Sequence, residues 1–177
     1  MILLMGLPGA GKGTQGKIMA DQHGMHLVSM GEIIRMYVTG NRRSRMLAGE
    51  LLEDSEVIEL VSRILDGIEN KNLCVLDGFP RTVAQAEWLL AKAKADGFSI
   101  SHVIHLIASE NTVKDRLHAR GRLDDRDDVI NERFKEYKEL TEPLFSWFKQ
   151  HNVNVINIDA GRSVDAVNDD VTKSLNL

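Results

Sequence analysis

The residues with the clearest chemical meaning lie near the start of the chain, in the segment Gly6 to Gln15, which reads GLPGAGKGTQ. The segment follows a short apolar run, Met1 to Met5, and precedes a stretch with the composition of a helix. A glycine-rich loop between a strand and a helix lets several backbone N–H groups point at one anion, and the helix start adds its positive dipole. The spacing of Gly6, Gly11 and Lys12 matches the phosphate-binding loop G-x-x-x-x-G-K, so we expect phosphate to bind here.

The loop departs from that pattern after its lysine. Gly13 follows Lys12, and the hydroxyl that usually binds magnesium comes one residue later, at Thr14. The loop alone therefore predicts a bound phosphate, and it leaves open both direct magnesium ligation by Thr14 and the fate of the phosphate.

A second set of polar residues follows the apolar run Leu73 to Leu76. Asp77 comes directly after this run, and Arg81 lies in the next turn, GFPRT. Open α/β folds bind ligands at the carboxyl edge of the sheet, where Asp77 would face Lys12 if the two strands are neighbours. A carboxylate there suits the water shell of a magnesium ion, and Arg81 suits a second anion.

Further arginines recur later in the chain, at Arg116, Arg120, Arg122 and Arg133. Arg116 and Arg120 are four residues apart and would share a helix face. A guanidinium group binds phosphate oxygens as a fork and stays charged, so the cluster suits the stabilisation of a transferring phosphoryl group. The alternative is a solvated run in which these arginines pair with the aspartates of RGRLDDRDD, residues 120–128, and residue counting does not decide between the two.

The composition limits the class of protein. A length of 177 residues fits one domain, and 43% hydrophobic with 27% charged residues is typical of a soluble globular protein. The net charge of −4 argues against broad nucleic-acid binding. The first apolar run is too short for a membrane span or a signal peptide, so we expect a cytoplasmic protein that does not bind membranes.

The residues of the chain do not predict a zinc site or a nucleophilic catalytic triad. The single cysteine, Cys74, excludes a thiolate zinc site, and the six histidines show no metal-ligand spacing. No Ser, His and Asp set stands out as a nucleophilic triad. Phosphoryl transfer requires only positioning and charge neutralisation, which fits this inventory.

Apolar runs alternate with segments of helical spacing along the chain. The runs are Ile2 to Met5, His26 to Val28, Leu73 to Leu76, Val103 to Ile107 and Val153 to Ile158. Strand and helix in alternation predict a doubly wound α/β domain with a parallel sheet of about five strands and helices on both faces. The segment from Ser29 to about Ser55 has no strand pattern and is broken at Gly40-Asn41 and Gly49, so we expect a helical insertion there.

These motifs together resemble the adenylate kinase family of nucleoside monophosphate kinases, over nearly the whole chain. The resemblance lies in residues 6–15, 26–35, 76–87, 116–125, 130–144 and 158–167. It implies a single P-loop kinase domain over residues 1–177, with a monophosphate-binding insertion at 29–57 and a lid at 120–128 that is shorter than is usual in the family. It also implies reversible phosphoryl transfer from magnesium-bound ATP to AMP, giving two ADP.

The resemblance also assigns roles to individual residues. The ATP-binding residues would be Gly9, Ala10, Gly11, Lys12, Gly13, Thr14, Arg116, Arg120, Arg162 and Val164. The AMP-binding residues would be Met30, Arg35, Leu52, Val57, Gly78, Arg81, Gln85, Arg122 and Arg133. The catalytic residues would be Lys12, Asp77, Arg81, Arg120, Arg122 and Arg133. Arg116 would stack on the donor adenine, Asp77 and Glu32 would organise the magnesium waters without binding the ion directly, and Asp124 with Asp125 would orient the lid.

The identity of the acceptor base depends on two positions of this resemblance. Gln85 matches the family glutamine that pairs with adenine, whereas UMP/CMP kinases usually have asparagine there, so Gln85 favours AMP. Met30 stands where adenylate kinases generally carry threonine, which keeps CMP, UMP or another small acceptor open. A nucleotide sensor without turnover is the remaining alternative. The short lid predicts no zinc, and a monomer is the simplest expectation.

Overall fold

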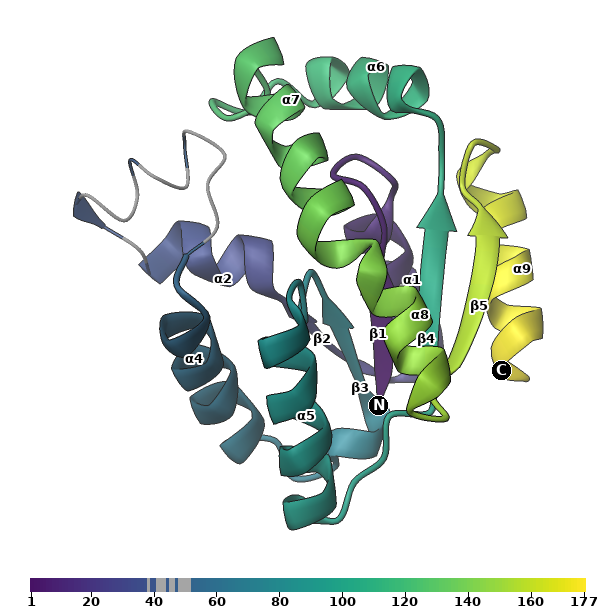
Figure 1. Cartoon of the computed structure of the whole chain (residues 1–177). Coiled ribbons are helices and arrows are strands. Elements are labelled where there is room, and N and C mark those ends of the chain that lie inside the picture. Colours follow the sequence, from purple (N-terminus) through teal and green to yellow (C-terminus); the bar gives the residue numbers. More distant parts are fainter. Residues whose placement is uncertain (38, 41–43, 45–46, 48–51) are drawn as a thin grey trace.

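Five strands form one parallel sheet in the computed structural model, which describes residues 1–37, 39–40, 44, 47 and 52–177. They are β1 (Ile2–Met5), β2 (His26–Ser29), β3 (Cys74–Asp77), β4 (His102–Ile107) and β5 (Asn154–Asp159). Their order across the sheet is β2-β3-β1-β4-β5 (Figure 1). The parallel α/β sheet predicted from the alternating pattern is thereby confirmed.

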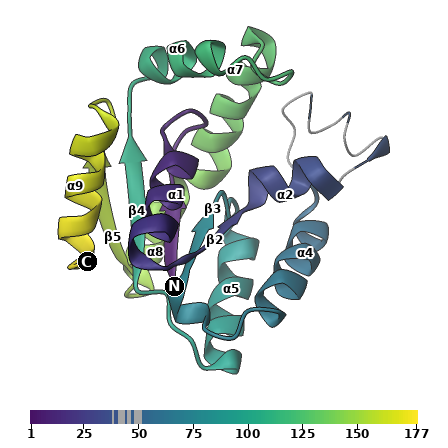
Figure 2. The same ribbon diagram turned by 180° about the vertical axis from the view of Figure 1, so that it is seen from behind.

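The helices cover both faces of this sheet. They are α1 (Lys12–His23), α2 (Met30–Tyr37), α4 (Asp54–Asp66), α5 (Val83–Asp96), α6 (Glu110–Arg120), α7 (Asp127–Glu136), α8 (Pro143–Gln150) and α9 (Val164–Leu175), with a short 3₁₀ turn η1 (Lys71–Leu73) and a π-helical turn η2 (Tyr137–Thr141). Helices α4, α5 and α8 cover one face, and α1 and α9 cover the other (Figures 1 and 2).

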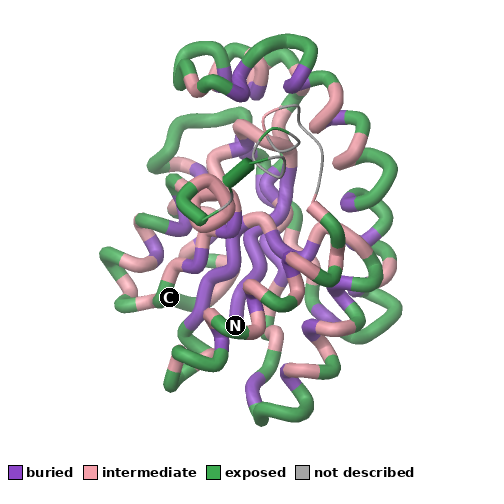
Figure 3. Tube along the Cα trace, turned by 90° about the vertical axis from the view of Figure 1, so that its left-hand side faces the viewer, coloured by how far each residue is buried: buried purple, intermediate pink, exposed green. Residues whose placement is uncertain are grey.

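The central strand shows why its sequence is an unbroken apolar run. Leu3 and Met5 pack into the core beneath α4, α5 and α8, while Ile2 and Leu4 pack into the core beneath α1 and α9. Successive side chains of a strand point to opposite faces, so a strand that is covered on both sides must be apolar at every position. In Figure 3 the buried residues accordingly run through the centre of the molecule.

The strand order creates a crevice at the carboxyl edge of the sheet. Leu4 of β1 pairs with Asp77 of β3 on one side and with Ile104 of β4 on the other, and every strand arrow in Figure 1 points to the same edge. Helix α1 follows β1 onto one face, whereas α5 follows β3 onto the other. Neighbouring strands whose helices leave to opposite faces open a crevice between them, the usual ligand site of such folds.

Some helices begin with a side-chain cap, whereas α1, like α4, α7 and α8, does not. The side chains of Thr82, Ser109 and Ser163 accept hydrogen bonds from the first turns of α5, α6 and α9. Such caps stabilise a helix by about 1 kcal/mol each. Helix α1 begins after Gly11 and has no side-chain cap, so its first N–H groups face the crevice without a side-chain acceptor.

Two segments that the sequence marked as irregular can be compared with the helix boundaries. Helix breaks were expected at Gly40-Asn41 and at Gly49. Asn41 and Gly49 lie outside the described residues, so these breaks stay predictions. Arg120 ends α6, and Asp127 and Asp128 begin α7, so only residues 121–126 of the segment 120–128 lie outside helices, and the role of this segment as a lid stays a prediction. Acidic residues stabilise a helix N-terminus, and Asp127 and Asp128 form the first turn of α7. In the sequence they were interpreted as part of a charged loop.

Within the described residues, no helix combines the length and apolar character that crossing a membrane requires.

We expect Leu3→Ala to lower the free energy of unfolding by about 2–5 kcal/mol, because it leaves a cavity in the central strand. The side chain of Leu3 is fully buried. Leu123→Ala is the matched control, since Leu123 is 80% exposed and its truncation should change stability by less than about 0.5 kcal/mol. Urea unfolding of the two variants measures the difference, and equal losses would contradict the described core.

Candidate active site

A cleft of about 570 Å³ opens at the carboxyl edge of the sheet. Its walls come from the loop after β1, the turn after β3, the start of α2, the end of α6, and the segments that begin η2 and α9. It brings together most of the site residues expected from sequence: Gly9, Ala10, Gly11, Lys12, Gly13, Thr14, Glu32, Arg35, Asp77, Gly78, Arg81, Arg116, Arg120, Arg122, Arg133, Arg162 and Val164. Residues far apart in the chain therefore share one concave surface.

The glycines of the loop after β1 are required by close packing. At Gly6, a Cβ atom would lie 2.4 Å from the carbonyl oxygen of Leu106, and at Gly9 it would lie 2.8 Å from that of Val113. Both glycines have positive φ, as does Gly11 directly before α1. The loop can press against β4 and α6 only because it lacks side chains at these places.

Lys12 is held inside its own loop. Its Nζ donates to the carbonyl oxygens of Gly6 at 2.9 Å and Leu7 at 3.0 Å. Burial lowers the pKa of Lys12 to about 8, against the opposing effect of the Asp77 carboxylate, and nearby arginines add to the lowering. A bound anion would reverse this shift, so the charge of Lys12 is coupled to occupancy of the loop.

Asp77 faces the loop from the neighbouring strand, as its position after the third apolar run predicted. Its carboxylate accepts a hydrogen bond from the Ser29 hydroxyl at 3.0 Å, and a Cβ atom on Gly13 would lie 3.6 Å from it. Glu32 lies 3.8 Å from the Lys17 ammonium in an exposed ion pair. Among the residues that the structure describes, no cluster of three His, Cys, Asp or Glu side chains is close enough to hold a metal ion.

Asp77 and Glu32 nevertheless suit a magnesium ion that keeps its waters. Magnesium binds oxygen ligands and dehydrates reluctantly, so one or two carboxylates beside a phosphate are a usual arrangement. Asp77 is nearly buried next to Lys12 and has one carboxylate oxygen engaged by Ser29. The residues present therefore fit a hydrated divalent cation at the loop.

Arg81 is fixed by contacts along its backbone and side chain. Its Nε donates to the carbonyl oxygen of Gly78 at 3.0 Å, and its own carbonyl accepts from the Thr141 hydroxyl at 3.0 Å. Burial and the charge of Arg133 both lower the pKa of its guanidinium, against the effect of Asp77. Arg81 is thus a positioned cation beside the centre of the cleft.

Two buried aspartates of the segment between α6 and α7 hold Arg120 and Arg133. Asp125 accepts from Nε and Nη2 of Arg120 at 2.9 and 2.6 Å and from the backbone N–H of Arg122 at 3.0 Å. Burial opposes the ionisation of Asp125, but these hydrogen bonds outweigh it and lower its pKa. Asp124 accepts from the guanidinium of Arg133. Sequence reasoning left open whether the arginines pair with these aspartates in a solvated run or serve an anion. The pairing is present for Arg120 and Arg133, although Asp124 and Asp125 are buried rather than solvated, and the binding of an anion by these arginines stays a prediction.

Two arginines of the cleft lack such partners. Within the described part of the chain, the guanidinium groups of Arg35 and Arg122 have no hydrogen bond or ion pair. Burial lowers the pKa of Arg35, and the charge of Arg122 is the next largest cause. Cations that crowd one another without a carboxylate partner favour the binding of an anion between them.

Arg116 braces the far end of the cleft. Its Nη1 and Nη2 donate to the carbonyl oxygens of Ala160 and Arg162 at 2.8 and 3.3 Å. These bonds tie α6 to the turn before α9, where the backbone near Val164 was expected to line a pocket. The stacking of Arg116 on a donor adenine stays a prediction.

Four expected acceptor residues, Met30, Leu52, Val57 and Gln85, do not line the cleft. Met30 and Val57 are core residues, and Leu52 packs against the same cluster. Gln85 is 2% exposed, and both ends of its amide are engaged by protein groups. Their roles in base recognition stay predictions.

Sequence reasoning missed several residues that support the site. Ser29 ends β2 beside Asp77, and its place at the end of a predicted strand was the available signal. Tyr137 and Thr141 belong to a π-helical turn, which has no distinctive pattern in one sequence.

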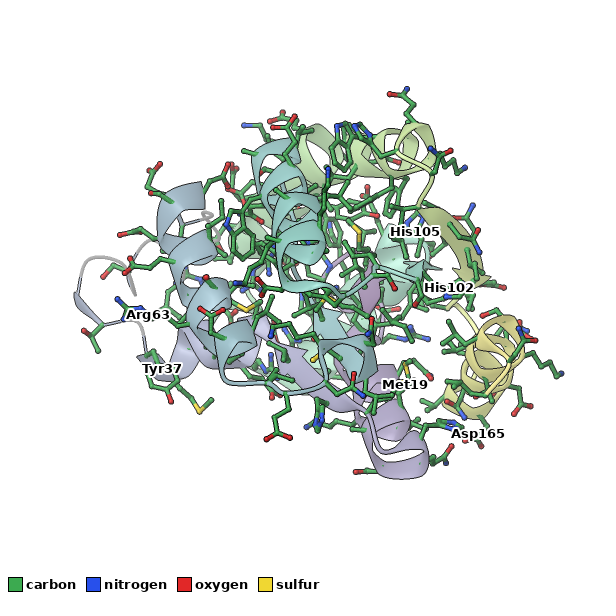
Figure 4. The ribbon with its side chains drawn as sticks, turned by 90° about the horizontal axis from the view of Figure 1, so that it is seen from below. Met19, Tyr37, Arg63, His102, His105 and Asp165 are labelled. Atoms are coloured by element: carbon green, nitrogen blue, oxygen red, sulfur yellow. The ribbon has the colours of Figure 1, made fainter. Side chains whose placement is uncertain are left out.

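Tyr137 is held by a small polar cluster. Its hydroxyl lies 2.9 Å from Nε2 of His105, whose Nδ1 lies 3.1 Å from the amide oxygen of Asn157. An amide oxygen only accepts, so Nδ1 donates and Nε2 of the neutral ring accepts from Tyr137. Burial lowers the pKa of His105, and its ring stacks on Phe145; Figure 4 marks its place near β5.

Over most of its length the chain is similar to known proteins. Residues 4–153 match the family model described as adenylate kinase. The chain is 38% identical to an adenylate kinase of Mycobacterium sp. (strain MCS), over 94% of this chain and 93% of that protein. It is 35% identical to an adenylate kinase of Synechococcus sp. (strain WH7803), over 98% and 97%, and 33% identical to one of Nitrobacter hamburgensis, over 98% and 91%.

The position of Lys12 predicts a pH-dependent affinity for polyphosphate. The empty protein loses the Lys12 proton near pH 8, whereas a bound anion keeps it, so the dissociation constant of a nucleoside triphosphate should be flat below pH 8. Above pH 8 it should rise by up to about tenfold per pH unit, since each proton bound with the ligand gives that slope. Calorimetric titration from pH 7 to 9.5 measures the constant, and thermal melts at each pH control for unfolding. An affinity that does not change over this range would contradict the coupling.

Proposed function

Because the chain belongs to the adenylate kinase family, we propose that it transfers a phosphoryl group reversibly from magnesium-bound ATP to AMP, forming two ADP. The chain is accordingly a phosphotransferase of the nucleoside monophosphate kinase class. The observation that carries the finer proposal is one cleft in which a phosphate loop faces a second group of cations. A protein that only sensed nucleotides would have no need for cations on both sides of a transferring group.

The donor phosphates lie, in this proposal, on the loop from Gly9 to Thr14. Its N–H groups at the uncapped start of α1 would donate to the phosphate oxygens, and Lys12 would exchange its bonds to the Gly6 and Leu7 carbonyls for the phosphate. The donor base would lie toward Arg116, Arg162 and Val164, at the end of the cleft that α9 begins.

The acceptor phosphate lies, in this proposal, between Arg35, Arg81 and Arg122. These side chains line one cleft with the loop, and Arg35 and Arg122 hold no partner among the described residues. A dianionic phosphate would therefore relieve their mutual repulsion. This arrangement would place the attacking oxygen on the opposite side of the transferring group from the leaving oxygen.

Phosphoryl transfer requires that the negative charge between the attacking and the leaving oxygen be neutralised. In phosphoryl transfer, negative charge on the moving group and its neighbours is stabilised by fixed cations, and no covalent intermediate is required. In this proposal Arg120 and Arg133 would supply it, and their hydrogen bonds to Asp125 and Asp124 support that role. Because the carboxylates fix the arginines before substrate binds, little reorganisation is needed during the reaction.

Asp77 and Glu32 would hold the water shell of a magnesium ion, as their place in the cleft supports. When bound, the ion would neutralise charge on the donor phosphates. Ser29 would keep the Asp77 carboxylate turned toward the loop through its hydrogen bond.

The remaining parts of the proposal concern organisation and setting. Residues 1–177 would form one kinase domain, with the acceptor insertion at 29–57 and a minimal lid. The protein would be a cytoplasmic monomer whose partners are ATP, ADP and AMP, without nucleic acid or membrane, and the net charge of −4 supports the absence of broad nucleic-acid binding.

AMP is the proposed acceptor because Gln85 stands near Arg81 on the acceptor side. Met30, buried in the core, offers no hydroxyl to a base. CMP and UMP are the alternative acceptors. Mixing the protein with ATP, magnesium and each monophosphate, and measuring the diphosphate formed, separates them. We expect kcat/KM for AMP to exceed that for CMP and UMP at least tenfold, and a preference for either pyrimidine would overturn the acceptor assignment but not the kinase class.

Arg81→Ala should lower kcat/KM about 10²–10³-fold, because one fixed cation is lost from the charged transition state. Its effect on the free energy of unfolding should stay within about 1 kcal/mol, since a single hydrogen bond to Gly78 is removed. Steady-state kinetics and urea unfolding measure the two effects.

Arg63→Ala is the matched control for that variant. Arg63 lies on α4 and pairs with Glu59 at the exposed surface (Figure 4). Its loss should leave kinetics unchanged and stability within about 0.5 kcal/mol. If Arg81→Ala were as active as this control, the acceptor-phosphate role of Arg81 would be wrong.

A further inference from the structure

We propose that Asp54 is a positioning residue for the acceptor side of the cleft, where it fixes the amide of Gln85 and the turn that carries Arg81. The inference rests on the proposed function and deepens it. Asp54 lies in the first turn of α4 and does not line the cleft, so it would act through its neighbours and not on the substrate.

Asp54 joins α4 to the start of α5 with both carboxylate oxygens. Oδ1 accepts from Nε2 of Gln85 at 2.7 Å, and Oδ2 accepts from the hydroxyl of Thr82 at 2.9 Å. Thr82 in turn caps α5 by accepting from the backbone N–H of Gln85. The other end of the Gln85 amide, Oε1, accepts from the backbone N–H of Arg81 at 2.8 Å. A continuous chain of hydrogen bonds therefore runs from Asp54 to Arg81.

This chain permits only one orientation of the Gln85 amide. A carboxylate only accepts hydrogen bonds, and a backbone N–H only donates them. Turning the amide over would set its oxygen against Asp54 and its NH₂ against the N–H of Arg81, which loses both bonds and adds repulsion. Asp54 therefore determines which side of the amide carries the donor and which the acceptor.

The fixed amide has consequences for an acceptor base. Adenine presents an acceptor nitrogen beside a donor amine, so an amide can pair with it in only one order of donor and acceptor. One hydrogen of Nε2 and one lone pair of Oε1 are engaged by protein, so a base that reached this 2%-exposed amide would pair with the second of each. Because the same amide holds the backbone of Arg81, the base and the phosphate of one acceptor would be bound by groups in a single network.

A second tie between α4 and α5 provides a comparison within the same fold. Asp66, in the last turn of α4, accepts from Lys92 of α5 at 2.7 Å. This ion pair joins the same two helices at the other end of α4 and contacts neither Gln85 nor Arg81. Loss of either tie weakens the packing of α4 on α5, but only Asp54 would affect the acceptor.

The experiment compares Asp54→Ala, Asp54→Asn and Asp66→Ala with the unchanged protein. Each is assayed for ADP formation with AMP and ATP varied in turn, and each is melted thermally. Asp54→Ala should raise KM for AMP about tenfold, the effect of one hydrogen bond to a charged group, with KM for ATP changed less than twofold. Asp54→Asn keeps an oxygen for Gln85 without the charge, so its KM for AMP should rise only about threefold.

The possible outcomes distinguish failure of the positioning role from failure of the proposed kinase function. Asp66→Ala should leave both KM values within twofold of those of the unchanged protein, whatever its melting temperature. If Asp54→Ala changed both KM values equally, or resembled Asp66→Ala, the positioning role would be overturned while the kinase function stood. If Asp54→Ala failed to fold, Asp54→Asn would provide the test. A rise in KM for AMP alone would support the positioning role, and equal changes in both KM values would overturn it. An unchanged protein that made no ADP from AMP would overturn both the function and the inference.

Discussion

The repulsion among cations at the carboxyl edge of the sheet is the constraint on which the site depends. Lysine and arginine side chains from the first loop, α2, the turn after β3, and the lid converge on one cleft. Buried aspartates offset part of this charge, since Asp124 and Asp125 hold Arg133 and Arg120. Arg35 and Arg122 are left without partners in the described part of the chain. The fold thus retains an excess of positive charge, which costs stability when the cleft is empty and favours an anion that fills it.

Much of the fold follows from the sequence because the sheet is buried on both faces. Each strand must then be apolar at successive positions, as at Leu3 and Leu4, and such runs stand out from helical segments. The phosphate loop was also predictable, because positive φ and close packing at Gly6 and Gly9 leave glycine as the residue that fits. Asp77 followed from topology, since the residue after a parallel strand lies at the ligand edge.

The features of the site that could not be predicted from the sequence depend on contacts between segments far apart in the chain. A glutamine four residues after Arg81 has the chemistry to pair with a base, yet only the structure shows that Asp54 and the N–H of Arg81 engage it. Met30 is similar, since its type does not reveal that it faces the core. The π-helical turn that brings Thr141 to the carbonyl of Arg81 has no period that a single sequence displays. In these three cases the type of secondary structure does not determine the role of the residue. Its burial and its hydrogen-bond partners do.

The internal bonds of Lys12 affect how fast a ligand can be captured. Because its ammonium group binds the carbonyl oxygens of Gly6 and Leu7, the loop keeps its shape without a phosphate. An incoming anion would meet a formed surface, so we expect the Lys12 side chain to exchange its partners without a prior rearrangement of the loop backbone. The long-range field of the cleft then guides the encounter, and such guidance weakens as dissolved salt screens the charges. We therefore expect the association rate of an anionic ligand at this loop to fall as ionic strength rises.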